Sequence, residues 1–122
     1  MRYFLIPITF LLFSCTHQKQ IQNSTDTQYI KAKLIRQSCA STVIQILDKN
    51  YYTLAEKWTE MGTNKVVENA VAVANKCDMP KTINVNDEFY FKVVPKESTN
   101  QECIVCMMMD YPPNKSVYIK VK

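Results

Sequence analysis

The sequence YIKAKLIR at residues 29–36 alternates between apolar and basic side chains. Ile30, Ala32 and Leu34 fall on one face of an extended chain, and the two lysines between them fall on the other. This alternation is typical of a β-strand with one buried face and one solvated face. We therefore predict that the folded domain begins with a strand here.

Three other segments have the same character. Residues 41–47, STVIQIL, are β-branched and apolar, as buried strands often are. Residues 88–94 and 116–122 alternate with period two, which predicts strands with one face in the core. The side chains expected to point inward from these two strands are Phe89, Phe91, Val93, Val117, Ile119 and Val121.

Three less regular segments complete the domain. Residues 66–75 favour a strand that places Val67, Val71 and Val73 on one side. The continuous apolar run at residues 103–109 predicts a strand buried on both faces. Residues 51–59 are expected to form a helical turn or an irregular crossing segment.

The single tryptophan of the crossing segment, Trp58, is expected to fill the core or to cover it as a lid. Turns depend on asparagine because the chain has one glycine, Gly62, and asparagine tolerates left-handed backbone. Five or six short strands in about 94 residues predict an all-β fold. We expect a small five- or six-stranded antiparallel barrel of OB-like type, or a sandwich, stapled by disulfides.

The N-terminus resembles the export signal of a bacterial lipoprotein. Arg2 precedes an apolar run of about eleven residues, which is too short for a membrane-spanning helix of about 20. The sequence LFSC at residues 12–15 resembles a lipobox, whose cysteine receives lipid after cleavage. We predict a signal peptide at residues 1–14 and lipidation of Cys15 with acyl chains such as palmitate, which would hold the chain on a membrane.

The mature chain is then expected to have two parts. Residues 15–28 comprise the lipidated cysteine and a polar, flexible tether, and residues 29–122 form one small β domain. Thr16 follows the cysteine, and the absence of aspartate at that position favours the outer membrane by analogy with enteric sorting. We expect a location in the cell envelope, with the protein facing the periplasm or the cell surface.

Four cysteines remain in the domain, namely Cys39, Cys77, Cys103 and Cys106. An even number in an exported domain of this size predicts two disulfides. In an extended segment Cys103 and Cys106 would point to opposite faces, so we expect each of them to pair with Cys39 or Cys77. The order of that pairing stays open.

The CIVC sequence at residues 103–106 also has the spacing of thiol oxidoreductases and of metal sites. Soft sulfur ligands suit Cu(I), and a shared strand face would bring cysteine and methionine sulfurs together. The alternative hypothesis is therefore a periplasmic thiol-redox or copper-handling protein. Its candidate ligands are Cys103, Cys106, Met107 and Met109.

Other chemistry has little support in the sequence. The only histidine, His17, lies in the tether, so no Ser-His-Asp or Cys-His arrangement is available to the domain. One glycine cannot form a phosphate-binding loop. The formal charge is +4 with no basic run of five or more residues, which argues against nucleic acid as a partner. We expect no catalytic activity and no cofactor.

Five short sequences give the domain a family resemblance: RQSCA at residues 36–40, VIQI at 43–46, NKC at 75–77, FYF at 89–91 and QECIVC at 101–106. Together they resemble small cell-envelope lipoproteins of Bacteroidota-type bacteria. The resemblance implies a disulfide-bearing all-β envelope domain and supplies no activity or site. We therefore expect a small binding or accessory module that is attached to the membrane through Cys15. Its expected partner is an envelope protein complex.

Overall fold

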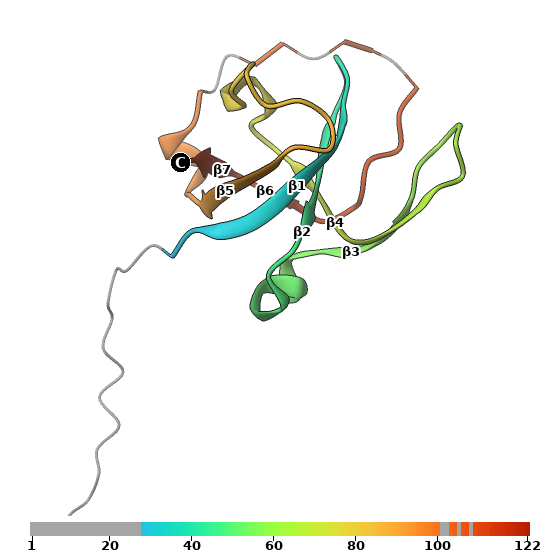
Figure 1. The fold of residues 1–122 in the computed structure, drawn as a ribbon. Helices are drawn as coiled ribbons and strands as arrows, with labels where there is room; N and C mark the ends of the chain where they lie inside the picture. Colours follow the sequence, from blue (N-terminus) through green and yellow to red (C-terminus); the bar gives the residue numbers. More distant parts are fainter. Residues whose placement is uncertain (1–27, 101–102, 105, 108) are drawn as a thin grey trace, which may run out of the picture.

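The computed structural model describes residues 28–100, 103–104, 106–107 and 109–122, and Figure 1 shows the fold. The predicted signal peptide, Cys15 and the tether as far as Thr27 lie outside the described residues. Within the described part of the chain, no helix is long and apolar enough to cross a membrane. Three short 3-10 turns connect the strands: η1 (Lys49–Leu54), η2 (Lys76–Asp78) and η3 (Lys96–Ser98).

The described residues form one sheet of seven strands. The predicted all-β class is therefore confirmed. The strands are β1 (Ile30–Gln37), β2 (Thr42–Ile46), β3 (Glu56–Thr59), β4 (Val66–Val73), β5 (Glu88–Val93), β6 (Ser116–Val117) and β7 (Ile119–Val121).

The pairing order follows a ring. Strands β4, β2, β1, β5 and β7 pair in that order, all antiparallel. β6 lies directly before β7 in the chain and pairs in parallel with β4, through Ala72 opposite Ser116 and Val73 opposite Val117. Because only these two residue pairs return to β4, the sheet is a partly open barrel of the OB-like type.

The number of strands exceeds the predicted five or six for two reasons. The C-terminal strand is divided at Tyr118, where its pairing changes from β4 to β5. In addition, the segment predicted as a crossing at residues 51–59 forms the turn η1 and then the strand β3, which pairs with β4. The helical turn was thus predicted correctly, and the strand was missed.

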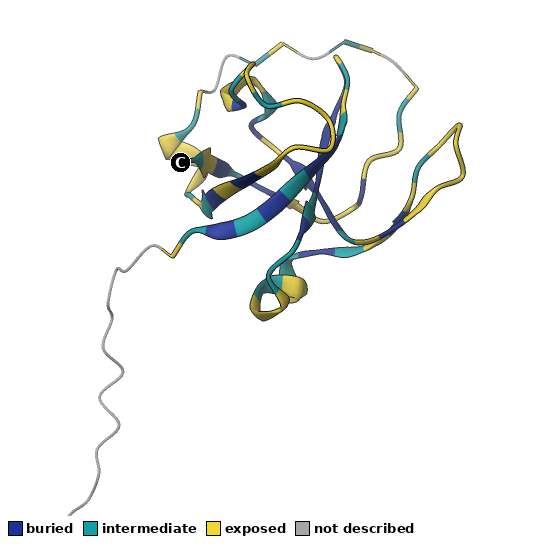
Figure 2. Ribbon diagram, viewed as in Figure 1, coloured by how far each residue is buried: buried dark blue, intermediate teal, exposed yellow. Residues whose placement is uncertain are grey.

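The main core lies inside the curved sheet. Phe91, Leu34 and Ile44 are fully buried there, as are other side chains from the inner faces of β1, β2, β4 and β5 (Figure 2). Burying a side chain of this size contributes about 1.5–3 kcal/mol to folding. The inward positions predicted for Phe89, Phe91, Val117 and Ile119 are confirmed, and Val121 is half-buried against the same core. Val93 is exposed, contrary to the prediction.

A second apolar cluster packs outside the main core and includes Trp58. A β-bulge in β1 lies beside this cluster. In β1 the register shifts between Leu34 and Arg36, and the intervening Ile35 joins the second cluster. The members of this cluster are Ile35, Val43, Trp58, Val67 and Ala70. The prediction of Trp58 as a core residue is confirmed.

One predicted strand face is wrong because β4 contains a bulge. Val67 packs with Ala70 in the second cluster, whereas Val71 lies in the main core. Asn69 between them has φ of 57°, and the pairing between β3 and β4 shifts register at this point. A left-handed residue inside a strand moves the following side chains to the opposite face.

The apolar run at residues 103–109 was also predicted wrongly. Its described residues form no strand, and Ile104, Met107 and Met109 are exposed instead of buried. Prediction of the turns was better. Gly62, Asn64 and Asn86 all have positive φ, as the turn chemistry required.

Candidate functional site

The candidate site is the segment that joins η3 to β6, which we call the strap. Its described residues are 99–100, 103–104, 106–107 and 109–115. In Figure 1 this segment crosses the top of the barrel without entering the sheet. A segment without strand pairing needs other contacts to hold it, and the strap has several.

Two disulfides fix its first half to the barrel. Cys39 pairs with Cys106, and Cys77 pairs with Cys103, with Cα–Cα distances of 5.4 and 5.5 Å. The backbone N–H of Cys106 also donates to the carbonyl of Cys39 at 3.2 Å. The prediction that Cys103 and Cys106 pair with separate cysteines is confirmed, and the structure supplies the pairing that the sequence left open.

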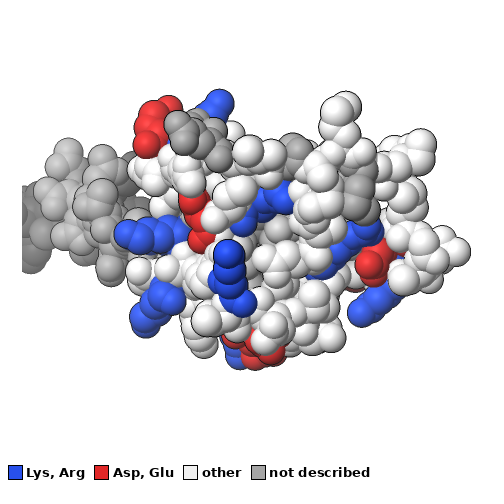
Figure 3. All heavy atoms as spheres, turned by 90° about the horizontal axis from the view of Figure 1, so that it is seen from above, with Lys and Arg blue, Asp and Glu red and all other residues white. Residues whose placement is uncertain are grey.

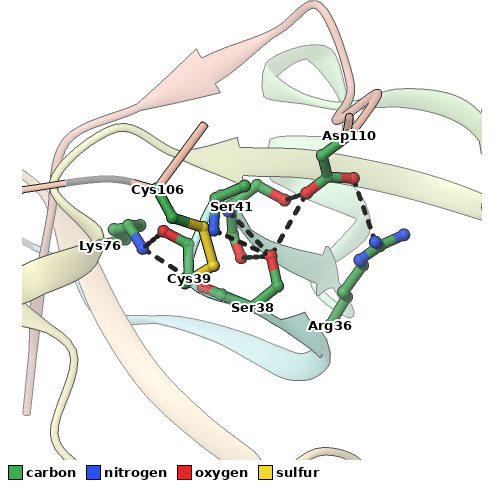
Figure 4. Close-up of a disulfide and its surroundings, with 8 residues drawn as sticks. Arg36, Ser38, Cys39, Ser41, Lys76, Cys106 and Asp110 are labelled. Carbon is green, nitrogen blue, oxygen red and sulfur yellow. Dashed lines mark hydrogen bonds and ion pairs between the residues drawn. A yellow bond between two sulfur atoms is a disulfide. The ribbon is translucent and has the colours of Figure 1, made fainter. Parts of the chain in front are cut away.

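Lys76 links the barrel segments that carry these two disulfides. Its ammonium donates to the carbonyl of Ser38 at 3.2 Å and to the carbonyl of Cys39 (Figure 4). Cys77 follows Lys76 directly in the chain. The turn after β1 and the η2 turn are therefore joined by a side chain as well as through the strap.

A buried carboxylate fixes the second half of the strap. The Asp110 side chain is only 3% exposed, and its Oδ1 lies 3.2 Å from Nη2 of Arg36 (Figure 4). Oδ1 has this ion pair but accepts no hydrogen bond. Oδ2 accepts hydrogen bonds from the hydroxyls of Ser38 and Ser41. The carboxylate is therefore held by one ion pair and two hydroxyl donors.

The loop that supplies these donors has a defined geometry of its own. The backbone N–H of Ser38 donates to the carbonyl of Ser41 at 2.9 Å, and the Ser38 hydroxyl accepts from the N–H groups of Ala40 and Ser41. This turn directly follows β1, so the first hairpin positions both serines and Arg36 toward the strap. Glu60 is the second anion near Arg36, at 4.0 Å.

The strap then follows β3 toward β6. The indole Nε1 of Trp58 donates to the carbonyl of Tyr111 at 2.7 Å. Pro113 is buried, and Lys115 donates to the carbonyls of Thr53 and Ala55, each at 3.1 Å. The strap is thus held by covalent, ionic and hydrogen-bonding contacts along its described length.

What the strap presents to the outside is apolar. Ile104 is 91% exposed, Met107 104%, Met109 77% and Tyr111 60%. Figure 3 looks down on this side of the molecule and shows mainly uncharged side chains, with separate basic and acidic ones among them. Large exposed apolar side chains on a fixed backbone are a feature of binding surfaces.

The predicted site residues are thus only partly brought together. Cys103, Cys106, Met107 and Met109 share no strand face, and both cysteine sulfurs are in disulfides. A disulfide sulfur is not the thiolate that a redox centre or a Cu(I) site needs. Within the described ranges, no group of three or more His, Cys, Asp or Glu residues is placed to hold a metal. Cys15 and His17 lie outside these ranges.

The Asp110 contacts were missed by the sequence analysis. The only available signal was one acidic residue at the end of an apolar run, followed by prolines. Nothing in the spacing connects Asp110 with Arg36 or with the serines, which lie far earlier in the chain. Only the folded hairpin brings these groups together.

A cleft of about 500 Å³ lies beside β5 and β7. Its charged lining residues are Lys92, Lys120 and Asp78, and Ile119 lies among its apolar ones. The Asp78 carboxylate accepts hydrogen bonds from Asn75 Nδ2 at 2.9 Å and from the N–H of Asn100 at 3.0 Å. The cleft therefore combines two cations with one acid that already holds neighbouring loops.

Comparisons of the chain with protein-family models, with curated proteins and with solved structures find no match. The resemblance to envelope lipoproteins therefore stays a prediction from the sequence.

Proposed function

We propose that this chain is a lipid-anchored envelope protein that acts as a small binding or accessory module, and that the strap is its contact with a partner protein. The observation that carries the proposal is the row of exposed Ile104, Met107, Met109 and Tyr111 side chains on a backbone held by two disulfides and by buried Asp110.

A loop that is fixed in advance binds at a lower entropic cost than a flexible one. Binding an apolar segment gains free energy from surface removed from water, but loses some of it when a flexible loop must become fixed. The disulfides and the Arg36–Asp110 ion pair fix this loop before any partner arrives. Met107 and Met109 add side chains that adapt to an irregular surface. The expected partner is a protein with an apolar recess.

The attachment is proposed from the sequence. Cleavage before Cys15 and lipidation of its thiol would place the domain in the cell envelope, with the outer membrane favoured by Thr16. The tether would let the domain reach a neighbouring complex. A module held at a membrane needs only modest affinity, because its partner is met at high effective concentration.

The two disulfides favour this function over thiol or copper handling. Each cysteine of the CIVC sequence is joined to a different cysteine of the barrel. Both are therefore occupied in holding the strap, and Met107 and Met109 are left without an adjacent thiolate.

The test has one variant for each half of the proposal. Cys15→Ser is expected to release the protein from membranes into the soluble fraction. Met107→Gln with Met109→Gln is expected to keep the protein on the membrane and to abolish recovery of a stoichiometric partner after crosslinking. Met61→Gln is the matched control, because Met61 is 40% exposed and lies in the turn between β3 and β4, outside the strap. Equal recovery with the control and the strap variant would contradict the proposal.

A further inference from the structure

The outer face of β1, β5 and β7 gathers five lysines that are far apart in the sequence. Inward side chains such as Ile30, Phe91 and Ile119 alternate with them along each strand. The pairing places Lys31 opposite Tyr90 and Lys92 opposite Lys120. We call Lys31, Lys33, Lys92, Lys120 and Lys122 the lysine face.

Tyr29 joins this face at the point where the tether enters the domain. The Lys92 ammonium lies 5.9 Å from the centre of the Tyr29 ring, and the Lys122 ammonium lies 5.3 Å from it. Cation–π contacts of this kind orient both lysines around one aromatic ring. Tyrosine also suits a membrane–water interface, since its ring is apolar and its hydroxyl is polar.

Acidic groups neutralise little of the lysine face. Glu88 lies 3.2 Å from the Lys31 ammonium and is the acidic residue on the same strand faces. Asp78 shares the cleft with Lys92 and Lys120, but its carboxylate is hydrogen-bonded to Asn75 and Asn100. Asp48 lies near Lys31 in a shallow depression and accepts from the N–H of Asn50.

The pairing of Lys92 with Lys120 points to an external anion. Like charges directly opposite one another on a sheet destabilise it. An arrangement of this kind is stabilised when a negatively charged surface lies against it. The predicted anchor supplies a geometric reason to expect such a surface, since Tyr29 follows Cys15 by only 14 residues and a chain of that length spans at most about 50 Å.

We propose that the lysine face lies against the anionic headgroups of the membrane that holds the lipidated Cys15; the inference rests on the proposed function for the anchor. Tyr29 precedes β1 and Ser38 follows it, so the tether and the Asp110 contact of the strap meet opposite ends of a strand about 26 Å long. The exposed side chains of the strap are not part of the lysine face, so both surfaces can be occupied at once.

The experiment measures the reaction of each lysine with a membrane-impermeant acylating reagent, read by mass spectrometry. The lipidated protein is reconstituted into neutral phosphatidylcholine vesicles and into vesicles with 30% phosphatidylglycerol. In the anionic vesicles the reactivity of Lys92, Lys120 and Lys122 is expected to fall about threefold or more, and to recover in high salt. Lys57 and Lys65 are internal controls, because they lie on or beside β3, at the other end of the strand order.

Two double variants distinguish an effect of the lysine face from an effect of the protein's total charge. Lys92→Gln with Lys120→Gln is expected to restore the reactivity of Lys122 in anionic vesicles. Lys57→Gln with Lys65→Gln removes the same charge and is expected to leave the protection intact. Equal reactivity in the two kinds of vesicle, or equal effects of the two double variants, would overturn the proposal.

Failure of the anchor gives a different result. If the protein purified from the bacterium that makes it carries no lipid, the unlipidated protein is mixed with the same two kinds of vesicle and its lysine reactivity is measured. Salt-sensitive protection of the lysine face in anionic vesicles alone would still support the lipid contact, and its absence would overturn it.

Discussion

The guanidinium of Arg36 lies 3.2 Å from the carboxylate of Asp110 and connects the first strand with the strap. The side chains are 18% and 3% exposed, so the pair is largely shielded from solvent. Asp110 is the point at which the second half of the strap is held by charge, as the disulfides hold the first half.

Removing that charge is expected to destabilise the fold. Asp110→Asn leaves Arg36 with the more distant Glu60 and should lower the free energy of unfolding by about 2 kcal/mol. The measurement is denaturant unfolding. The matched control is Glu68→Gln, which breaks the exposed Lys57–Glu68 pair and should cost less than about 0.5 kcal/mol. Equal losses would mean that the buried pair has no special role.

The two disulfides are expected to differ in their contributions. Their partners are separated by 67 and 26 residues, and a longer closed loop restricts the unfolded chain more. The loop-entropy relation gives about 4.4 kcal/mol for Cys39–Cys106 and about 3.5 kcal/mol for Cys77–Cys103. Replacing each pair by serine and measuring unfolding should show the larger loss for Cys39–Cys106. The reverse order would show that loop length does not govern their effect.

The lysine pair on β5 and β7 predicts a small gain in stability. Lys120→Gln removes a like charge opposite Lys92 and should raise the free energy of unfolding by about 0.3 kcal/mol at low salt. Lys57→Gln, which removes a favourable contact with Glu68, should lower it by a similar amount. Thermal unfolding measures both, as shifts of about 1–2 °C of opposite sign. High salt should remove both shifts, and shifts that persist in salt would argue against an electrostatic cause.

The Lys31–Glu88 contact predicts a change in titration. A hydrogen bond from Lys31 to the Glu88 carboxylate, together with its charge, raises the pKa of Lys31 above 10.5. A raised folded-state pKa favours the protonated folded protein. The contribution is thus complete below the unfolded pKa and is lost as pH rises through the folded value. Glu88→Gln should return the Lys31 pKa to its ordinary range, measured by NMR titration of the side chain. An unchanged pKa would remove Glu88 as the cause.

The strand segments were largely predictable because their faces alternate. Residues 29–36 and 116–122 display their buried and exposed sides directly in the sequence. The first forms β1 at nearly the expected bounds, and the second forms β6 and β7, divided at Tyr118. The sequence predicted an OB-like barrel or a sandwich, but not which strands pair with one another. β3 was missed because four residues in which Trp58 alone is buried carry too short a pattern.

The strap was not predictable from local sequence. An apolar run normally indicates burial, and residues 103–109 have no polar positions to suggest otherwise. The first half of the strap stays outside the sheet because both of its cysteines are bound to the barrel. The second half stays outside because Asp110 forms an ion pair with Arg36. These are long-range contacts that spacing does not encode. The lysine face was missed similarly, since strand pairing brings together lysines that the sequence scatters.

The most direct test of the account is site-specific photocrosslinking from the strap in intact cells. A photoreactive amino acid at position 107 should give one discrete crosslinked protein, and the same group at position 61 should not, although both side chains are exposed. Asp110→Asn, which loosens the strap, should weaken the crosslink. The contrary result is a crosslink from position 61 as strong as that from position 107, or none from position 107, and it would show that the strap is not the binding surface.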